Sequence, residues 1–115
     1  MIEWKIPIKT VSESNCMEHW AKKHKRHKAQ KEAIAWELKP FKFVLPCSVW
    51  LTRIAPRKLD SDNLQGAFKW IRDAISETIT GCKIAGRADD DPRISWHYQQ
   101  EKGRPKEYAI KIAII

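Results

Sequence analysis

The chain has 115 residues, of which 43% are hydrophobic and 31% charged, and its formal net charge is +8. This length predicts a single domain over residues 1–115, and the composition excludes a disordered chain. No apolar run reaches the roughly 18–20 residues that a membrane-spanning helix needs. The first ten residues lack the apolar stretch of a signal peptide, so we expect a cytoplasmic protein with no membrane partner.

The excess of positive charge lies entirely in the first half of the chain. Residues 1–59 carry 13 Lys or Arg and 5 Asp or Glu, whereas residues 60–115 carry 9 of each kind. Such asymmetry favours a polyanionic partner, most often nucleic acid. A surface kept soluble by its charge is the simpler alternative. The three cysteines are widely spaced, which predicts reduced, packed thiols rather than disulfides or a zinc ribbon.

The first half of the chain predicts two strands around one helix. Apolar and polar residues alternate over 2–8, which is typical of a strand with one buried face. A helical stretch covers 17–38 and ends before Pro40. Alternation returns over 41–54 and predicts a strand that Pro46 interrupts or bulges.

The second half predicts a further helix and two more strands. Apolar residues recur at helical spacing over 62–79, and Gly81 fits the end of this helix. Strands are expected over 92–100 and 107–115, with turn residues between them. The order β-α-β-α-β-β predicts an α/β (α+β) fold with a small mixed β-sheet and helices packed on it.

The first predicted helix is strongly basic. Its segment 22–28, KKHKRHK, holds five Lys or Arg and two His, while Ala29, Ala33 and Trp36 form the stripe expected to pack. His24 and His27 have the spacing of a helical metal site, but within a lysine run we expect them to be solvated or to contact phosphate.

The chain has six tryptophans, which could stack on bases. Because most of them fall on apolar stripes, we expect core or interface packing. Trp70 lies off the stripe of its helix and is the exception.

Two acidic clusters interrupt the basic chain. Asp60 and Asp62 precede the second predicted helix, and three aspartates occupy residues 89–91. Residues i and i+2 of an extended segment point the same way, so Asp60 and Asp62 can face one site. Mg²⁺ prefers carboxylates together with water and phosphate, and residues 89–91 can supply a ligand from another element. The pattern predicts a metal site suited to phosphodiester cleavage.

Lys69 is the candidate for a cationic catalytic group. On one continuous helix, Asp62, Lys69 and Asp73 share the polar face, and Gly66 leaves the path between them open. Lys69 would then stabilise negative charge on the phosphate. Simpler roles compete with this interpretation, because an aspartate at a helix start is commonly an N-cap and a Lys–Asp pair is commonly a surface pair.

The residues LDSDNLQGAFKWIRDAI, followed by ADDDPRI, resemble the RusA family of Holliday-junction resolvases, which is common on phages and prophages. The resemblance covers about residues 57–102. Asp60 and Asp62 match the two metal-binding aspartates of the family, Asp91 matches the third catalytic aspartate, and Asp90 matches the acidic residue before it. A shift of one residue within 89–91 is the alternative.

One position departs from the family pattern. The family's catalytic lysine stands four residues after the second aspartate, where this chain has Gly66. Lys69, which lies farther along the same predicted helix, resembles its replacement.

The resemblance implies a small mixed α/β homodimer that resolves four-way DNA junctions by paired symmetric nicks in DNA recombination and repair. The implied cofactor is Mg²⁺, with Mn²⁺ as a substitute, and no organic cofactor is expected. The metal ligands would be Asp60, Asp62, Asp90 and Asp91, and the catalytic residues Asp60, Asp62, Asp91 and Lys69. The residues expected to bind DNA are Lys22, Lys23, Lys25, Arg26, Lys28, Arg57 and Lys58. The alternatives are a non-catalytic basic nucleic-acid-binding module and a Mg²⁺-dependent nuclease for another branched or flap substrate.

Overall fold

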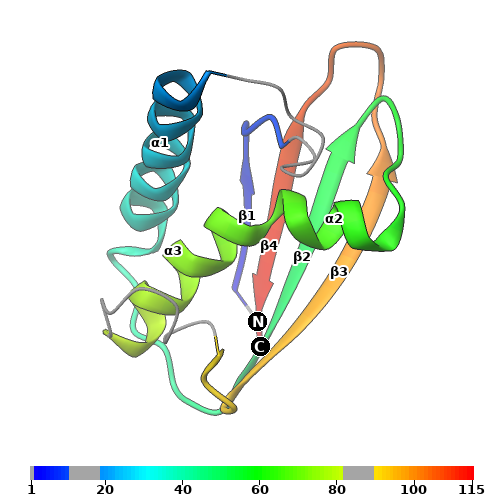
Figure 1. The fold of residues 1–115 in the computed structure, drawn as a ribbon. Helices are drawn as coiled ribbons and strands as arrows, with labels where there is room; N and C mark the ends of the chain where they lie inside the picture. Colours follow the sequence, from blue (N-terminus) through cyan, green and yellow to red (C-terminus); the bar gives the residue numbers. More distant parts are fainter. Residues whose placement is uncertain (1, 11–18, 82–89) are drawn as a thin grey trace. The chain divides into compact units, whose positions relative to one another are not determined.

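The computed structural model describes residues 2–10, 19–81 and 90–115. In chain order the elements are β1 (Ile2–Ile6), α1 (Trp20–Leu38), β2 (Cys47–Ala55), α2 (Ser61–Ala67), α3 (Lys69–Thr80), β3 (Ile94–Lys102) and β4 (Ala109–Ile114) (Figure 1). The described chain is thus a mixed α and β structure with a four-stranded sheet and three helices. The predicted order is confirmed, except that two helices replace the second predicted one.

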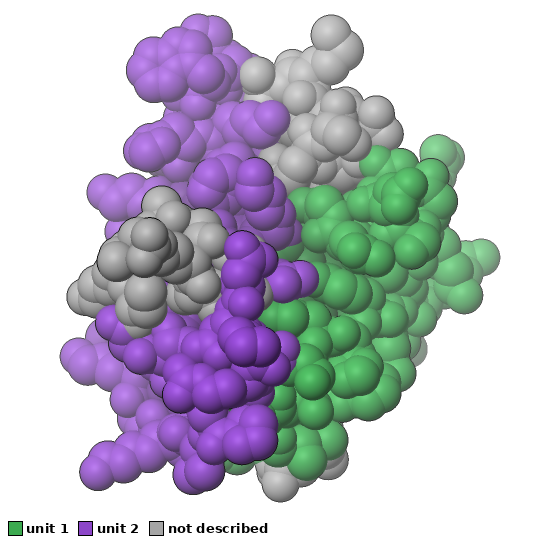
Figure 2. All heavy atoms as spheres, turned by 60° about the horizontal axis from the view of Figure 1, so that its bottom comes forward, with its two compact units in different colours: residues 1–16, 47–68, 95–115 green, residues 17–46, 69–94 purple. Residues whose placement is uncertain are grey.

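The residues group into two compact units (Figure 2). Unit 1 comprises residues 1–16, 47–68 and 95–115, and it holds α2 and nearly all of the sheet. Unit 2 comprises residues 17–46 and 69–94, and it holds α1 and α3.

The sheet of unit 1 has the strand order β1-β4-β2-β3. Strand β4 pairs antiparallel with both β1 and β2, so that Ile114 lies opposite Ile2 on one side and Val49 on the other. Strand β3 runs in the same direction as β2 (Figure 1). The sheet is therefore mixed, as the sequence predicts.

One face of the sheet carries the apolar core of unit 1. The buried side chains on this face are Trp4, Ile6, Val49, Leu51, Ile110, Ile112 and Ile114. They occupy alternate positions of their strands because successive side chains of a strand point to opposite faces. Phe68, which follows α2, is fully buried, and its ring lies tilted against Tyr98 of β3 with the centroids 6.0 Å apart.

Strand β2 is shorter than predicted. The strand expected over 41–54 begins only at Cys47, directly after Pro46, which has no N–H to donate to a strand neighbour. On the predicted inward face of the preceding segment, Phe41 is 40% exposed, and Phe43 and Leu45 are only partly buried. The structure therefore forms the predicted buried face fully only from Cys47 onward.

The last two strands follow each other in sequence but are not neighbours in the sheet. Their connection passes β2, which lies between them. At this crossing the N–H of Gly103 donates to the carbonyl oxygen of Ala55 at 2.8 Å. A Cβ atom on Gly103 would lie 2.9 Å from Oε1 of Glu107 and 3.1 Å from the side chain of Ile54, so a larger residue would require these neighbours to shift.

The second predicted helix is broken in two. Phe68 adopts φ −95° and ψ 0°, and its N–H donates to the carbonyl oxygens of Gln65 and Gly66, so α2 ends before α3 begins at Lys69. Gly66 lowers the helix propensity just before the break. The prediction of one continuous helix over 62–79 is wrong at this position, although the predicted apolar residues Leu64, Phe68, Ile71 and Ile75 are buried.

In unit 2, α1 packs through a different stripe from the one predicted. Its buried residues are Gln30, Ile34 and Leu38, whereas Ala29 is exposed and Trp36 is 75% exposed. The predicted stripe of Ala29, Ala33 and Trp36 is therefore wrong. The buried residues are spaced four apart and include the two large aliphatic side chains of this half of the helix, which bury more apolar surface than alanines do.

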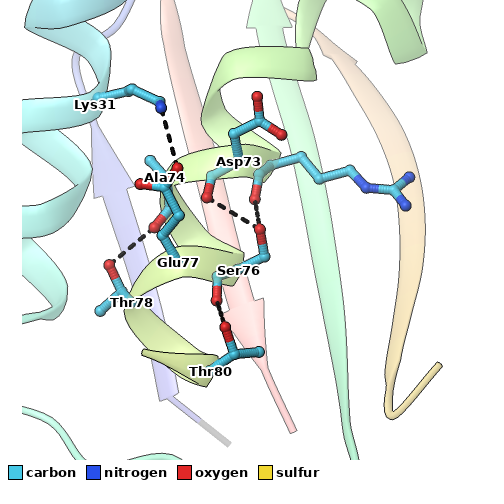
Figure 3. Close-up of polar contacts among 8 residues, drawn as sticks. Lys31, Asp73, Ala74, Ser76, Glu77, Thr78 and Thr80 are labelled. Atoms are coloured by element: carbon cyan, nitrogen blue, oxygen red, sulfur yellow. Dashed lines mark hydrogen bonds and ion pairs between the residues drawn. The ribbon is translucent and has the colours of Figure 1, made fainter. Parts of the chain in front are cut away.

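Hydrogen bonds stabilise α3 within unit 2, one to α1 and others within α3 itself (Figure 3). Nζ of Lys31 donates to Oε1 of Glu77 at 3.2 Å and links α1 to α3. The hydroxyl of Ser76 donates to the carbonyl oxygens of Arg72 and Asp73, which satisfies a side chain that is fully buried. The helix stops at Gly81, which has φ +72° and confirms the predicted end.

Three further expectations concern the tryptophans, the cysteines and a membrane-spanning helix. Trp20 is 73% exposed and Trp36 is 75% exposed, so neither lies in the core, and interface packing of these two stays a prediction, while Trp4 lies in the core. Cys47 is the expected buried thiol, and the other two cysteines lie outside the described residues. No helix in the described ranges is long and apolar enough to cross a membrane.

Candidate functional site

The segment that carries Asp60 and Asp62 enters α2 at an exposed position of unit 1. Asp60 is the N-cap of the helix, with Oδ1 accepting the backbone N–H of Asn63 at 2.9 Å and Oδ2 accepting Nδ2 of Asn63 at 3.1 Å. The predicted N-cap alternative is therefore confirmed for Asp60. Each carboxylate oxygen has a second lone pair, so the cap does not use up the capacity of Asp60 to bind a cation.

Asp62 lies in the first turn of α2, and its side chain is exposed. Within the described part of the chain, no residue forms a hydrogen bond or ion pair with its carboxylate. A carboxylate in the first helical turn is favoured by the unpaired N–H groups of that turn. Asp62 therefore presents both of its oxygens to solvent, as a ligand of a hydrated metal ion requires.

Gln100 of β3 anchors the loop before these aspartates. Its Nε2 donates to the carbonyl oxygen of Leu59 at 2.7 Å, and its Oε1 accepts the backbone N–H of Leu59 at 2.8 Å. Both backbone groups next to Asp60 are thereby held by one amide of the sheet. The sequence does not indicate this anchoring role of Gln100, because an amide on a strand gives no specific signal for a contact with a loop.

The second acidic cluster is described from Asp90 onward, and Asp89 lies outside the described residues. Asp90 is exposed. Oδ1 of Asp91 accepts the backbone N–H of Arg93 at 2.9 Å and its Nε at 3.0 Å, while Oδ2 accepts Nη2 at 2.7 Å. These hydrogen bonds, the side-chain bonds most of all, lower the pKa of Asp91 from 3.8 to about 2.

The predicted metal ligands are divided between the two units. Asp60 and Asp62 belong to unit 1, and Asp90 and Asp91 belong to unit 2. Among residues 2–10, 19–81 and 90–115, no three His, Cys, Asp or Glu side chains form a group that could hold a metal ion. The shared metal site remains a prediction, for which Asp62 and Asp90 supply exposed carboxylates.

Lys69 does not share one continuous helix with Asp62, as its predicted position on the same polar face required. The chain leaves the helix at Phe68, between the two residues. Lys69 is instead the first residue of α3 in unit 2, exposed, with Nζ 5.3 Å from the ring centroid of Trp70. Its catalytic role therefore rests on the resemblance alone.

Gly66 stands in open space. A Cβ atom added there would meet nothing within 4 Å, so the position that carries the family's lysine can accept a long side chain.

The predicted DNA-binding residues lie on two segments. On α1 in unit 2, Lys22, Lys25 and Lys28 are exposed, and Lys23 and Arg26 are partly exposed. Arg57 and Lys58 are exposed in the loop of unit 1 that leads to Asp60. Every one of these side chains is accessible, which binding to a polyanion requires.

An aromatic and basic cluster joins α1 to α3 in unit 2. The imidazole of His27 stacks on the indole of Trp70 with centroids 4.2 Å apart and an interplanar angle of 24°, and Nζ of Lys31 lies 6.0 Å from the same ring. His24 is exposed as predicted, whereas His27 is partly buried by this stack. Trp70 was rightly singled out from the other tryptophans, because its ring packs against basic side chains rather than in the apolar core.

A buried arginine in unit 1 was missed. Arg53 continues the inward-facing alternation of Val49 and Leu51 on β2 and is only 7% exposed. A charged residue at a position where the pattern requires an apolar one is a readable signal. The predicted strand over 41–54 gave Arg53 no separate role.

No protein-family model and no curated protein matches the chain. The likeness to the RusA family therefore rests on the aspartate-containing segments, and membership of that family stays a prediction.

Proposed function

We propose that the protein is a Mg²⁺-dependent endonuclease that acts on branched DNA and resolves four-way junctions, as its resemblance to the RusA family implies. The observation that carries the proposal is the segment from Leu59 to Asn63. There Gln100 anchors the backbone, Asp60 caps α2, and Asp62 offers an exposed carboxylate. Such a rigidly held pair of acidic residues, in a chain of net charge +8, suits a metal site that works on a polyanion.

The residues of the proposed site have separate tasks. Asp60 and Asp62, with Asp90 and Asp91 from the other unit, would hold Mg²⁺, which neutralises phosphate charge and provides hydroxide when it is bound. Asp91 remains ionised even in mild acid because Arg93 lowers its pKa. It can therefore act as a ligand without first losing a proton.

The basic face of α1 supplies the electrostatic part of DNA binding. Its exposed lysines would contact phosphates, which fixes the position of the DNA without reading its sequence. Affinity for the junction should therefore fall steeply as salt is added.

A homodimer belongs to the same proposal. Two matched cuts require two equivalent sites, which two-fold symmetry provides. Trp36, Phe41 and Val44 are exposed apolar side chains of one continuous segment, 36–44, which carries one acidic and two basic residues. This segment is suited to contact between two positively charged copies, and sedimentation equilibrium measures the association directly.

The main alternative is a non-catalytic nucleic-acid-binding module. The structure offers a specific reason to consider it, since Asp60 already serves as a helix cap and Asp91 already pairs with Arg93. Under this alternative the carboxylates stabilise the fold and take no part in chemistry.

A cleavage assay with three DNA substrates separates the two functions. A synthetic four-way junction, a matched duplex and a single strand are incubated with the wild-type protein, with and without Mg²⁺. Paired nicks that appear on the junction only with Mg²⁺ support the resolvase. Mg²⁺-dependent cuts in the duplex or the single strand instead would keep the metal site but change the substrate, and junction binding without any cut would favour the binding module.

A further inference from the structure

The guanidinium of Arg53 is held in place by neutral groups of unit 1. Its Nε donates to the hydroxyl of Thr10 at 3.1 Å, and its Nη1 donates to the carbonyl oxygen of Arg57 at 2.6 Å. These two bonds fix the plane of the guanidinium and leave its remaining N–H groups available, since arginine has five donors.

Arg53 has no anionic partner among the described residues. The two acceptors of its hydrogen bonds are neutral oxygens. Desolvation lowers the pKa of Arg53, and the nearby Tyr108 opposes this only in part. A buried charge is costly unless an opposite charge compensates it. Arg53, a residue that is only 7% exposed and has no carboxylate partner among the described residues, is therefore suited to bind an anion.

A pocket of about 330 Å³ opens beside this arginine. Its polar lining comes from Lys9, Thr10, Arg53, Arg57 and Tyr108, all in unit 1. Nζ of Lys9 lies 4.6 Å from the ring centroid of Tyr108, which keeps the ammonium group at the pocket. The lining thus includes three cations and no carboxylate, and the volume is many times the roughly 30 Å³ that one water molecule occupies in the liquid.

We infer that this pocket binds a phosphate group, and that in the complex with DNA this phosphate belongs to the DNA backbone next to the cut. Arginine and lysine bind phosphate through short charge-assisted hydrogen bonds, and a pre-oriented guanidinium does so with two parallel donors. The pocket also includes Leu59, the residue before Asp60, so a phosphate held there lies close along the chain to the proposed metal ligands. The assignment of DNA as the source of the phosphate rests on the proposed function, whereas phosphate binding itself does not.

Two lysines of the N-terminal segment provide a matched pair of variants. Lys9 lines the pocket, whereas Lys5 pairs with Lys111 in the sheet, and Lys111 lies opposite Thr52 rather than Arg53. Lys5 is therefore exposed on the opposite face of the sheet. Lys9→Gln and Lys5→Gln remove the same charge, and neither disturbs a buried side chain as a substitution of Arg53 would.

The first experiment uses ¹⁵N-labelled protein with EDTA and follows the Nε–H signal of Arg53 while inorganic phosphate is added. We expect a saturable shift, an affinity about tenfold weaker in Lys9→Gln, and no change in Lys5→Gln. A shift that does not saturate, or equal behaviour of the two variants, would overturn the inference. Cleavage plays no part in this measurement, so its outcome is independent of the proposed nuclease.

The second experiment decides where the phosphate comes from. Binding of the four-way junction is measured over a series of salt concentrations without metal ions. If the pocket holds a backbone phosphate, Lys9→Gln lowers the slope of log affinity against log salt by about 0.9, and Lys5→Gln leaves it unchanged. Saturable binding of inorganic phosphate with an unchanged slope in Lys9→Gln would contradict the DNA assignment and leave a site for free phosphate.

Discussion

Both carboxylate oxygens of Asp60 accept hydrogen bonds from Asn63. The backbone N–H of Asn63 donates at 2.9 Å, and its side-chain amide donates at 3.1 Å. This pairing fixes the first turn of α2 and gives Asp60 a structural role that is independent of any metal ion. A single residue therefore carries two proposed roles, and substitutions can separate them.

Asp60→Asn and Asp60→Ala should affect stability differently. Asparagine is as good an N-cap as aspartate, so Asp60→Asn should change the free energy of unfolding little, whereas Asp60→Ala should cost about 1 kcal/mol. Urea unfolding measures both values. If Asp60 also binds metal, Asp60→Asn loses cleavage while it keeps its stability, and a stable Asp60→Asn that cuts like the wild type would show that Asp60 is only a cap.

Gly66 can be replaced without a clash, since a Cβ atom there meets nothing within 4 Å. Gly66→Ala and Gly66→Lys should each stabilise the protein by up to about 1 kcal/mol, because glycine is the poorer helix former. Thermal unfolding tests this gain. Under the proposed function only Gly66→Lys also raises the cleavage rate, because it restores a lysine where the RusA family has one. Equal cleavage rates in the two variants would argue against that role for the position.

Arg93→Gln should raise the pKa of Asp91. The value should rise from about 2 but stay below 3.8, because the backbone N–H of residue 93 still donates to the carboxylate. The pair stabilises the folded state above pH 4 and loses this contribution as the pH falls toward 2, since the folded pKa lies below the ordinary one. Carboxyl NMR titration measures the shift, and Arg104→Gln is the control that should leave Asp91 unchanged.

Trp70→Leu should destabilise unit 2, since it removes the stack on His27 and the contacts with two lysines. We expect a loss of at least about 1 kcal/mol, part of which Trp70→Phe should recover. Trp20→Leu is the matched control because Trp20 is 73% exposed. Urea unfolding followed by circular dichroism compares the variants, and equal losses for Trp70 and Trp20 would contradict the packing role.

The sequence predicted the inward faces of the strands well. Alternation at Trp4 and Ile6, and again at Ile110, Ile112 and Ile114, matches the buried residues because the period of a strand is strict. The start of α2 was also readable, since aspartate is a favoured N-cap and the structure places Asp60 there.

The local sequence pattern gave wrong predictions where tertiary packing determines the helix boundaries and the buried positions. Phe68 fits the apolar stripe of a continuous helix, yet it occupies the break between α2 and α3, where its ring contacts Tyr98 of a strand distant in sequence. Trp36 fits a helical stripe on α1, but the register of burial follows Ile34 and Leu38 instead. Arg53 was overlooked because its partner Thr10 lies 43 residues away.

The most direct test of the central claim compares cleavage of a four-way junction by the wild type, Asp62→Asn and Glu3→Gln in Mg²⁺. Asp62 is exposed and forms no hydrogen bond or ion pair with other described side chains, and Glu3 is an exposed carboxylate on β1 outside the proposed site. The nuclease account predicts paired nicks by the wild type and Glu3→Gln, no nicks by Asp62→Asn, and junction binding by all three. Nicks by Asp62→Asn at the wild-type rate, or binding without nicks by all three proteins, would contradict it.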